Sequence, residues 1–117
     1  MQHAYRDDLA YIHDAGFGHL ATSVVPVILE ELNHAGSLGG TIVDFGCGSG
    51  VTSRLLYDAG YKVVGFDLSE PLLQMARKRV PGATFRMESF VTADIPPCVA
   101  VTAIGEVFNY TFDTANG

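Results

Sequence analysis

The stretch Thr41–Gly50, with the sequence TIVDFGCGSG, decides the fold. An apolar run that suits a buried strand carries an acid, Asp44, near its end and is followed by glycines at alternate positions. From Val51 onward the residues are compatible with a helix. Glycine has no Cβ, so it adopts left-handed torsions and lets a ligand approach the main chain closely. The stretch therefore predicts a strand, a tight turn and a helix that form the floor of a small-molecule site.

The spacing of the glycines restricts the class of ligand. A dinucleotide-binding loop follows the pattern G-x-G-x-x-G, and its last glycine would fall here on Val51 or on Ser53. A phosphate-cradling loop of the G-x-x-x-x-G-K type needs a lysine directly after its last glycine, and no lysine follows the loop here. Neither common phosphate loop fits. An ordinary tight turn between a strand and a helix remains the alternative to a ligand-binding loop.

Outward from this stretch, strand and helix patterns alternate. Downstream, the expected elements are a helix over 51–59, a strand over 62–66, a helix over 70–80 with Ser69 as its N-cap, and strands over 84–87 and 98–104. Upstream, apolar residues at helical spacing predict helices over 4–14 and 22–34, and Pro26 either lies in the first turn of the second helix or kinks it. Three of the strands are nearly continuous apolar runs. This pattern favours an α/β fold with a parallel sheet and helical crossovers.

An acid at the end of the second strand supplies an independent signal. Asp67 lies about 20 positions after the first loop glycine, at the tip of the strand expected beside the first one. A carboxylate at this place can accept hydrogen bonds from the ribose hydroxyls of an adenosine-containing ligand. The alternative is that Asp67 only caps the following helix, although Ser69 is also available for that role.

Composition and charge limit the other possibilities. A chain of 117 residues with 48% hydrophobic residues is expected to form one domain. Its net charge of −6 disfavours a nucleic-acid partner, and the basic run over 77–79 is expected to be a solvated helix face. The two cysteines lack C-x-x-C spacing and no run approaches membrane-spanning length, so we expect a cytoplasmic protein. The histidines show no ligand-like cluster, and no metal site is predicted.

The spacing Asp44-x-Gly46-x-Gly48-x-Gly50 resembles motif I of the class I S-adenosylmethionine-dependent methyltransferases. The resemblance continues in the order of that family's motifs over residues 43–50, 64–73, 85–90 and 98–110. It implies a Rossmann-like parallel sheet of order 3-2-1-4, truncated relative to the family's seven-stranded sheet of order 3-2-1-4-5-7-6 and preceded by two N-terminal helices. The chain is then one partial methyltransferase domain, with a helical lid over 1–40 and a cofactor-binding half-sheet over 41–117.

The resemblance also implies a set of residues that bind S-adenosylmethionine. Asp44 and the glycine loop would hold the amino-acid end, and Asp67 would bind the ribose. Leu68 would pack on the adenine, Glu88 or Ser89 would bind its amino group, and Phe90 would stack on the ring. The expected cofactor-binding residues are Asp44, Gly46, Cys47, Gly48, Gly50, Asp67, Leu68, Glu88, Ser89 and Phe90.

Methyl transfer from this cofactor mainly requires that the acceptor be held close and in line, with a base where the acceptor must lose a proton. The candidate bases are Glu106, Asn109, Tyr11 and His13. For each of them a surface or packing role is the competing interpretation. The expected function is methyl transfer to a small-molecule acceptor.

Two other functions stay open. One is a non-catalytic S-adenosylmethionine-binding module, and the other is a nicotinamide-binding module with exceptional loop spacing. Because the sequence ends soon after the fourth strand, we expect either a fragment of a longer enzyme or a short product. In the second case the chain would form a homodimer through that exposed strand edge.

Overall fold

The computed structural model describes residues 19–89 and 91–104. A helix covers residues 19–34. The elements that follow are β1 (Thr41–Phe45), α2 (Val51–Asp58), β2 (Lys62–Asp67), α3 (Glu70–Arg79), β3 (Thr84–Met87) and β4 (Ala100–Thr102). The helix predicted over 4–14 lies outside the described residues.

The strands form one parallel sheet with the order β3-β2-β1-β4. This confirms the predicted half-sheet and its topology. Asp44 of β1 is level with Thr102 of β4, and Asp67 of β2 is level with Met87 of β3. Because all the strands run in one direction, their carboxyl ends meet at a single edge of the sheet.

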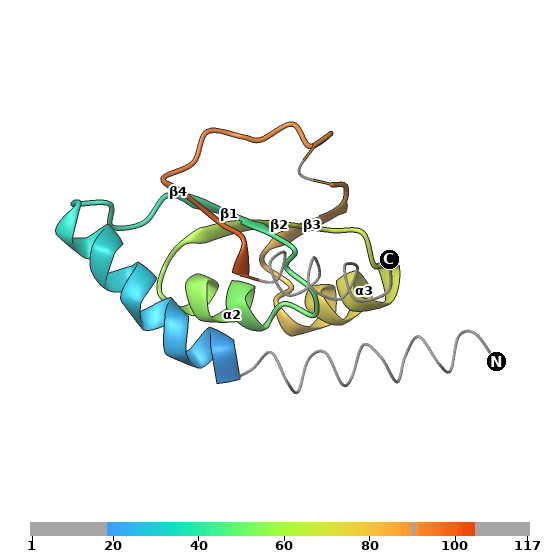
Figure 1. The fold of residues 1–117 in the computed structure, drawn as a ribbon, viewed down its shortest axis with the longest axis horizontal. Coiled ribbons are helices and arrows are strands. Elements are labelled where there is room, and N and C mark those ends of the chain that lie inside the picture. The colour runs from blue at the N-terminus through green and yellow to red at the C-terminus, as the bar shows by residue number, and fades with distance from the viewer. Residues whose placement is uncertain (1–18, 90, 105–117) are drawn as a thin grey trace, which may run out of the picture.

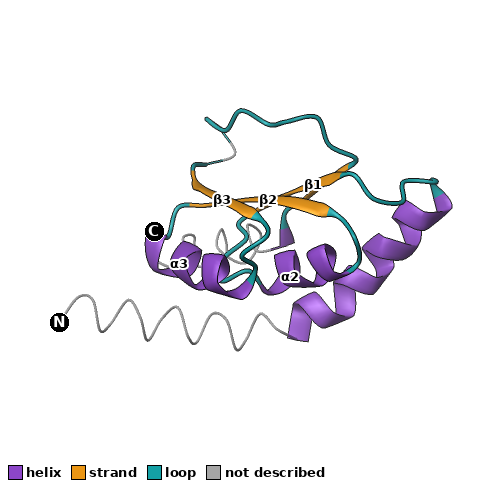
Figure 2. Cartoon of the chain, turned by 180° about the vertical axis from the view of Figure 1, so that it is seen from behind, coloured by secondary structure: helices purple, strands orange, loops and turns teal. Residues whose placement is uncertain are grey.

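The three described helices lie on the same side of the sheet, as Figure 1 shows and Figure 2 shows from behind. On the opposite side, the described part of the chain places the connection from β3 to β4. Side chains alternate between these two sides along each strand. The helices and the connection therefore cover different sets of apolar side chains.

The core on the helical side joins the first described helix to the sheet. Val25 and Leu32 of that helix pack in one cluster with Ile42 of β1 and Val63 of β2, which are level with each other. Burial of a side chain of this size contributes about 1.5–3 kcal/mol. This cluster therefore holds β1, the strand that leads into the glycine loop, against the first described helix.

A second cluster lies on the other side of the sheet. It contains Val43, Phe45 and Phe66, with Ala93 of the β3–β4 connection packed against it. The rings of Phe45 and Phe66 stack with their centroids 5.2 Å apart. These two phenylalanines lie near the carboxyl ends of β1 and β2. The cluster therefore holds together the end of β1, where the glycine loop begins, and the end of β2, where Asp67 lies.

Several element boundaries differ from the predicted ones, and α2 and α3 each end one residue earlier than predicted, at Asp58 and Arg79. The helix predicted to start at Thr22 already includes His19, so the predicted start was wrong, and Pro26 lies inside the helix rather than in its first turn. β4 covers three residues instead of the predicted seven, because its ladder with β1 runs only along Ile42–Asp44. β2 is one residue longer than predicted and ends at Asp67 itself.

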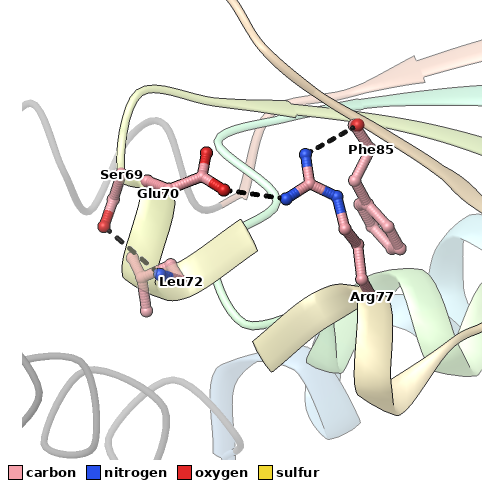
Figure 3. Close-up of polar contacts among 5 residues, drawn as sticks. All are labelled: Ser69, Glu70, Leu72, Arg77 and Phe85. Atoms are coloured by element: carbon pink, nitrogen blue, oxygen red, sulfur yellow. Dashed lines mark hydrogen bonds and ion pairs between the residues drawn. The ribbon is translucent and has the colours of Figure 1, made fainter. Parts of the chain in front are cut away.

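Helix α3 is held at its start and along its exposed face, as drawn in Figure 3. The Ser69 hydroxyl accepts a hydrogen bond from the Leu72 N–H at 3.4 Å, which confirms Ser69 as the N-cap. Arg77 donates to the Glu70 carboxylate at 3.0 Å and to the Phe85 carbonyl oxygen at 3.2 Å. The basic run is the predicted solvated face at Arg77 and Lys78, which are exposed, although Arg77 also ties α3 to β3. Arg79, in contrast, is half-buried.

Candidate functional site

The turn between β1 and α2 has the conformation that its glycines predicted. The φ angles of Gly46, Gly48 and Gly50 are 64°, 55° and 88°, all in the left-handed region that side chains with a Cβ rarely adopt. Among the described residues, every positive φ belongs to a glycine. A side chain at any of these three positions would therefore strain the turn.

Much of the loop's main chain is already hydrogen-bonded within the protein. The Cys47 N–H donates to the Phe66 carbonyl oxygen at 3.0 Å, and the Gly50 N–H donates to the Cys47 carbonyl oxygen at 3.0 Å. The Gly50 carbonyl oxygen in turn accepts from the Arg54 N–H at 2.8 Å. The N–H and the carbonyl oxygen of Gly50 are thus both hydrogen-bonded within the protein. In a ligand site, Gly50 would therefore shape the loop rather than bind the ligand.

Asp67 connects the loop to the tip of β2. Its Oδ2 atom accepts a hydrogen bond from the Gly48 N–H at 2.9 Å, and its Oδ1 atom accepts from the Ser69 N–H at 2.9 Å. Only 5% of the residue is exposed. A carboxylate offers about four acceptor positions, so two of them remain for a ligand. Ser69, not Asp67, is the N-cap of α3. Helix capping is therefore not the only role open to Asp67.

Asp44 is buried beneath the loop and is held from two elements. The Ser53 hydroxyl of α2 donates to Oδ2 at 2.9 Å, and the Thr102 hydroxyl of β4 donates to Oδ1 at 2.7 Å. Burial raises the pKa of Asp44 to about 6, although the two hydroxyl hydrogen bonds oppose the rise. The negative charge of Asp67 raises this pKa further. Asp44 therefore joins β1, α2 and β4 at the base of the loop.

The Cys47 side chain points away from the loop surface. Its sulfur packs in a buried cluster with Leu73, Ala76 and Phe85. Burial, the first cause, and the charges of Asp44 and Asp67 raise the pKa of the thiol well above its usual range. The thiol is thus a core group, and only the main chain of Cys47 could contact a ligand.

The predicted adenine-side residues lie along the same edge of the sheet. Leu68 follows β2 directly and is 68% exposed, which leaves its side chain available to cover a ligand. Glu88 and Ser89 follow β3 and are half-buried. The Ser89 carbonyl oxygen accepts from the Thr92 N–H at 3.2 Å and from the Ala93 N–H at 2.9 Å, so Ser89 begins a turn. The fold thus brings the loop, Asp67, Leu68, Glu88 and Ser89 to one edge.

The other predicted site residues lie outside the described residues: Phe90, Tyr11, His13, Glu106 and Asn109. Within the described ranges, no group of three or more histidines, cysteines or acids could hold a metal ion. The helices of the same ranges include none that is long and apolar enough to span a membrane.

Sequence reasoning missed three residues that hold the site. Ser53 and Thr102 bind the buried carboxylate, and Arg79 binds the loop at Ser49. A polar residue inside the apolar run of β4 was a signal for Thr102, because strand order places it level with Asp44. No comparable signal existed for Arg79, which lies 30 positions from its partner.

Comparisons with known proteins bear on this site. A family model described as "Methyltransferase domain" matches residues 42–114. The chain is 43% identical over 61 residues to trans-aconitate 2-methyltransferase of Acidovorax sp. strain JS42, a match over 50% of this chain and 23% of the relative. It is 49% identical over 41 residues to cypemycin N-terminal methyltransferase of Streptomyces sp., over 35% of this chain and 17% of the relative.

A solved structure shares the fold. It is magnesium protoporphyrin IX methyltransferase from Synechocystis PCC 6803 with bound SAM, at a TM-score of 0.64 and 26% identity. The similarity covers 76% of this chain and 44% of that one. The chain therefore spans less than half of that structure and about a fifth of the length of the two curated relatives.

Proposed function

Because this chain belongs to the methyltransferase-domain family, we propose that it binds S-adenosylmethionine and transfers the methyl group to a small-molecule acceptor. One observation carries the proposal. The Asp67 carboxylate lies at the tip of β2, within 2.9 Å of a glycine-loop N–H, and keeps acceptor positions for a ligand. An acid beside such a loop suits a ligand that presents ribose hydroxyls at the carboxyl edge of a parallel sheet.

In this proposal, residues at the carboxyl ends of three strands, β1, β2 and β3, divide the cofactor among them. Asp67 accepts hydrogen bonds from the ribose, Leu68 covers one face of the adenine, and Glu88 or Ser89 accepts from its amino group. The loop from Gly46 to Gly50 and the carboxylate of Asp44 hold the amino-acid end. Phe90 completes the adenine site in this proposal.

The bound cofactor supplies a methyl group already activated by its sulfonium. The protein's contribution is then to hold the acceptor within reach and in line, which can supply most of the acceleration. The rigid supports of the loop suit this task, because Asp67 and the Ser53–Asp44–Thr102 hydrogen bonds fix it from three strands and a helix. A base, where the acceptor needs one, would come from Glu106, Asn109, Tyr11 or His13.

The acceptor is proposed only as a class. The relatives named above act on trans-aconitate, on the N-terminus of cypemycin and on magnesium protoporphyrin IX, so similarity alone favours no single compound. The net charge of −6 favours an acceptor other than a nucleic acid. The composition also favours a cytoplasmic location.

Assembly through β4 is part of the proposal. In the described part of the chain β4 pairs with β1 alone, and it stands at the edge of the sheet. Val99 and Val101 beside this edge are 42% and 52% exposed. An apolar edge strand pairs readily with a second copy of the same chain. We therefore include a homodimer joined at β4.

Formation of S-adenosylhomocysteine tests the function. The chain is incubated with S-adenosylmethionine and with trans-aconitate, the acceptor of one relative, or with a panel of small carboxylates, phenols and amines. The proposal expects product above the acceptor-free blank with at least one acceptor class. Cofactor binding without turnover of any acceptor would favour the alternative, a non-catalytic S-adenosylmethionine-binding module.

A further inference from the structure

The last residue of α3 reaches back to the glycine loop. Arg79 donates from Nη1 to the Ser49 carbonyl oxygen at 3.0 Å and to the Ser49 hydroxyl at 2.9 Å. Ser49 stands between Gly48 and Gly50 and is 3% exposed. One guanidinium thus holds both the main chain and the side chain of a residue that lies between two of the loop glycines.

The position of Arg79 is itself fixed from α2. Arg54 donates from Nη1 to the Arg79 carbonyl oxygen at 2.9 Å, and its Nε atom pairs with the Asp58 carboxylate at 3.0 Å. This pairing caps the end of α3 with a cation, where the helix dipole favours positive charge. Helix α2, which follows the loop, therefore helps to hold Arg79 in the position from which it binds Ser49.

A separate observation shows that the loop is seated on α3. A Cβ built on Gly50 would lie 3.0 Å from the Ala76 Cα and 3.1 Å from its Cβ. The loop main chain thus packs directly on α3 one turn before Arg79. Contact with Ala76 limits the distance between loop and helix, and the guanidinium fixes the direction of the Ser49 carbonyl.

We propose that Arg79 is a positioning residue that holds the glycine loop in its cofactor-binding shape before the cofactor arrives; this rests on the proposed function. Three glycines give the free loop many accessible conformations, and ordering them on binding would reduce affinity. A hydrogen-bonded Ser49 carbonyl fixes the peptide planes on either side of it. Arg79 of α3 therefore keeps the loop in its binding conformation before a ligand is present.

The test compares Arg79→Gln, Arg79→Lys and Lys78→Gln in the 117-residue chain. Lys78 is the matched control, because it carries the same charge on the neighbouring position, is exposed, and shows no hydrogen bond or ion pair with the described residues. Two properties are measured: the affinity for S-adenosylhomocysteine by titration calorimetry, and amide hydrogen exchange at Gly48 and Gly50 without ligand. The Gly50 amide reports the turn itself, since it donates to the Cys47 carbonyl oxygen.

Arg79→Gln is expected to weaken binding about 5- to 30-fold, because the loop must then be ordered when the ligand binds. It should also speed exchange at both glycine amides. Arg79→Lys should recover most of the affinity, because an ammonium still reaches one Ser49 oxygen. Lys78→Gln should resemble the unchanged chain in both measurements.

Arg79→Gln that matches Lys78→Gln in exchange or in affinity would overturn the proposal. Should Arg79→Gln fail to fold, Ser49→Ala carries the test by removing one of the two acceptors, with an expected loss of about 2- to 5-fold. If the unchanged chain does not bind S-adenosylhomocysteine, the proposed function fails. The exchange rates then still decide whether Arg79 holds the loop.

Discussion

Asp67 has a structural role at the level of the single residue as well as the proposed role in binding. Its two oxygens accept from the N–H groups of Gly48 and Ser69 at the tip of β2. The structure therefore predicts that Asp67→Ala loses stability, because two N–H groups lose a buried acceptor.

We expect Asp67→Ala to abolish most S-adenosylhomocysteine binding and to lower the free energy of unfolding by about 1–3 kcal/mol. Asp67→Asn is the matched variant, since its amide oxygen still accepts one of the two hydrogen bonds. It should lose affinity with a smaller loss of stability. Urea denaturation and calorimetric titration measure both quantities, and full affinity in Asp67→Ala would remove the ribose role.

Asp44 makes stability depend on pH in a defined direction. Burial raises its pKa to about 6 from an ordinary value of 3.8, so the folded chain binds this proton more tightly than the unfolded chain. The resulting stabilisation is fully present below pH 4 and is lost as the pH rises through 6. The change amounts to about 3 kcal/mol at about 1.4 kcal/mol per pH unit.

Asp44→Asn removes this titration while its amide can still bind the Ser53 and Thr102 hydroxyls. Between pH 4 and pH 7 the variant should therefore gain stability relative to the unchanged chain, by up to about 3 kcal/mol. Urea denaturation of both proteins at each pH isolates the contribution of Asp44 from that of other acids. Parallel stability curves for the two proteins would show that the pKa of Asp44 is the same in the folded and the unfolded chain, which would contradict the prediction.

Individual residues were predictable from the sequence where local geometry required them. The left-handed torsions of Gly46, Gly48 and Gly50 follow from their place in a tight turn. Arg79 and Ser53 were not predictable in their roles, because their partners are brought near only by the packing of α2 and α3 on the sheet. From the sequence alone, a run of charged residues is expected to face solvent, and only the packing of the helix shows which of them contact the rest of the protein.

At the level of elements, the packing of the loop on α3 can be separated from the strain of its torsions. Gly50 and Gly36 have similar positive φ angles, 88° and 76°, but a Cβ on Gly36 would meet nothing within 4 Å. Each Gly→Ala change costs about 1–2 kcal/mol for the left-handed backbone. Gly50→Ala adds contact with Ala76, which typically costs about 1–3 kcal/mol more.

Thermal unfolding of Gly50→Ala and Gly36→Ala measures this difference. We expect Gly50→Ala to melt at a clearly lower temperature than Gly36→Ala. Equal melting temperatures would mean that α3 can move away from the loop without a loss of stability. That result would contradict close packing of Gly50 on Ala76.

Element order was more predictable than element length. β1 and β3 have the predicted bounds of 41–45 and 84–87, since turn residues delimit both runs. β4 is shorter than its apolar run because its parallel ladder with β1 extends only along Ile42–Asp44. Tertiary pairing, which the residue pattern does not encode, set that boundary.

For the molecule as a whole, the proposed homodimer joins two chains at β4, which within the described residues pairs with β1 alone. Light scattering at micromolar concentration should give a mass near twice 12.5 kDa for the unchanged chain. Val101→Lys places a charge beside the edge, where Val101 is now 52% exposed, and should shift the chain toward the monomer. Thr84→Lys, on the outer strand β3, is the control. A well-folded monomer of the unchanged chain would contradict the homodimer.

Calorimetric titration of the chain tests most directly whether the loop and Asp67 form the proposed S-adenosylmethionine site. Separate titrations use S-adenosylmethionine, S-adenosylhomocysteine and NAD. We expect saturable binding of the first two compounds and none of NAD, because the loop has no glycine at the last position of the G-x-G-x-x-G pattern. Binding of NAD with no response to either sulfur compound would contradict it.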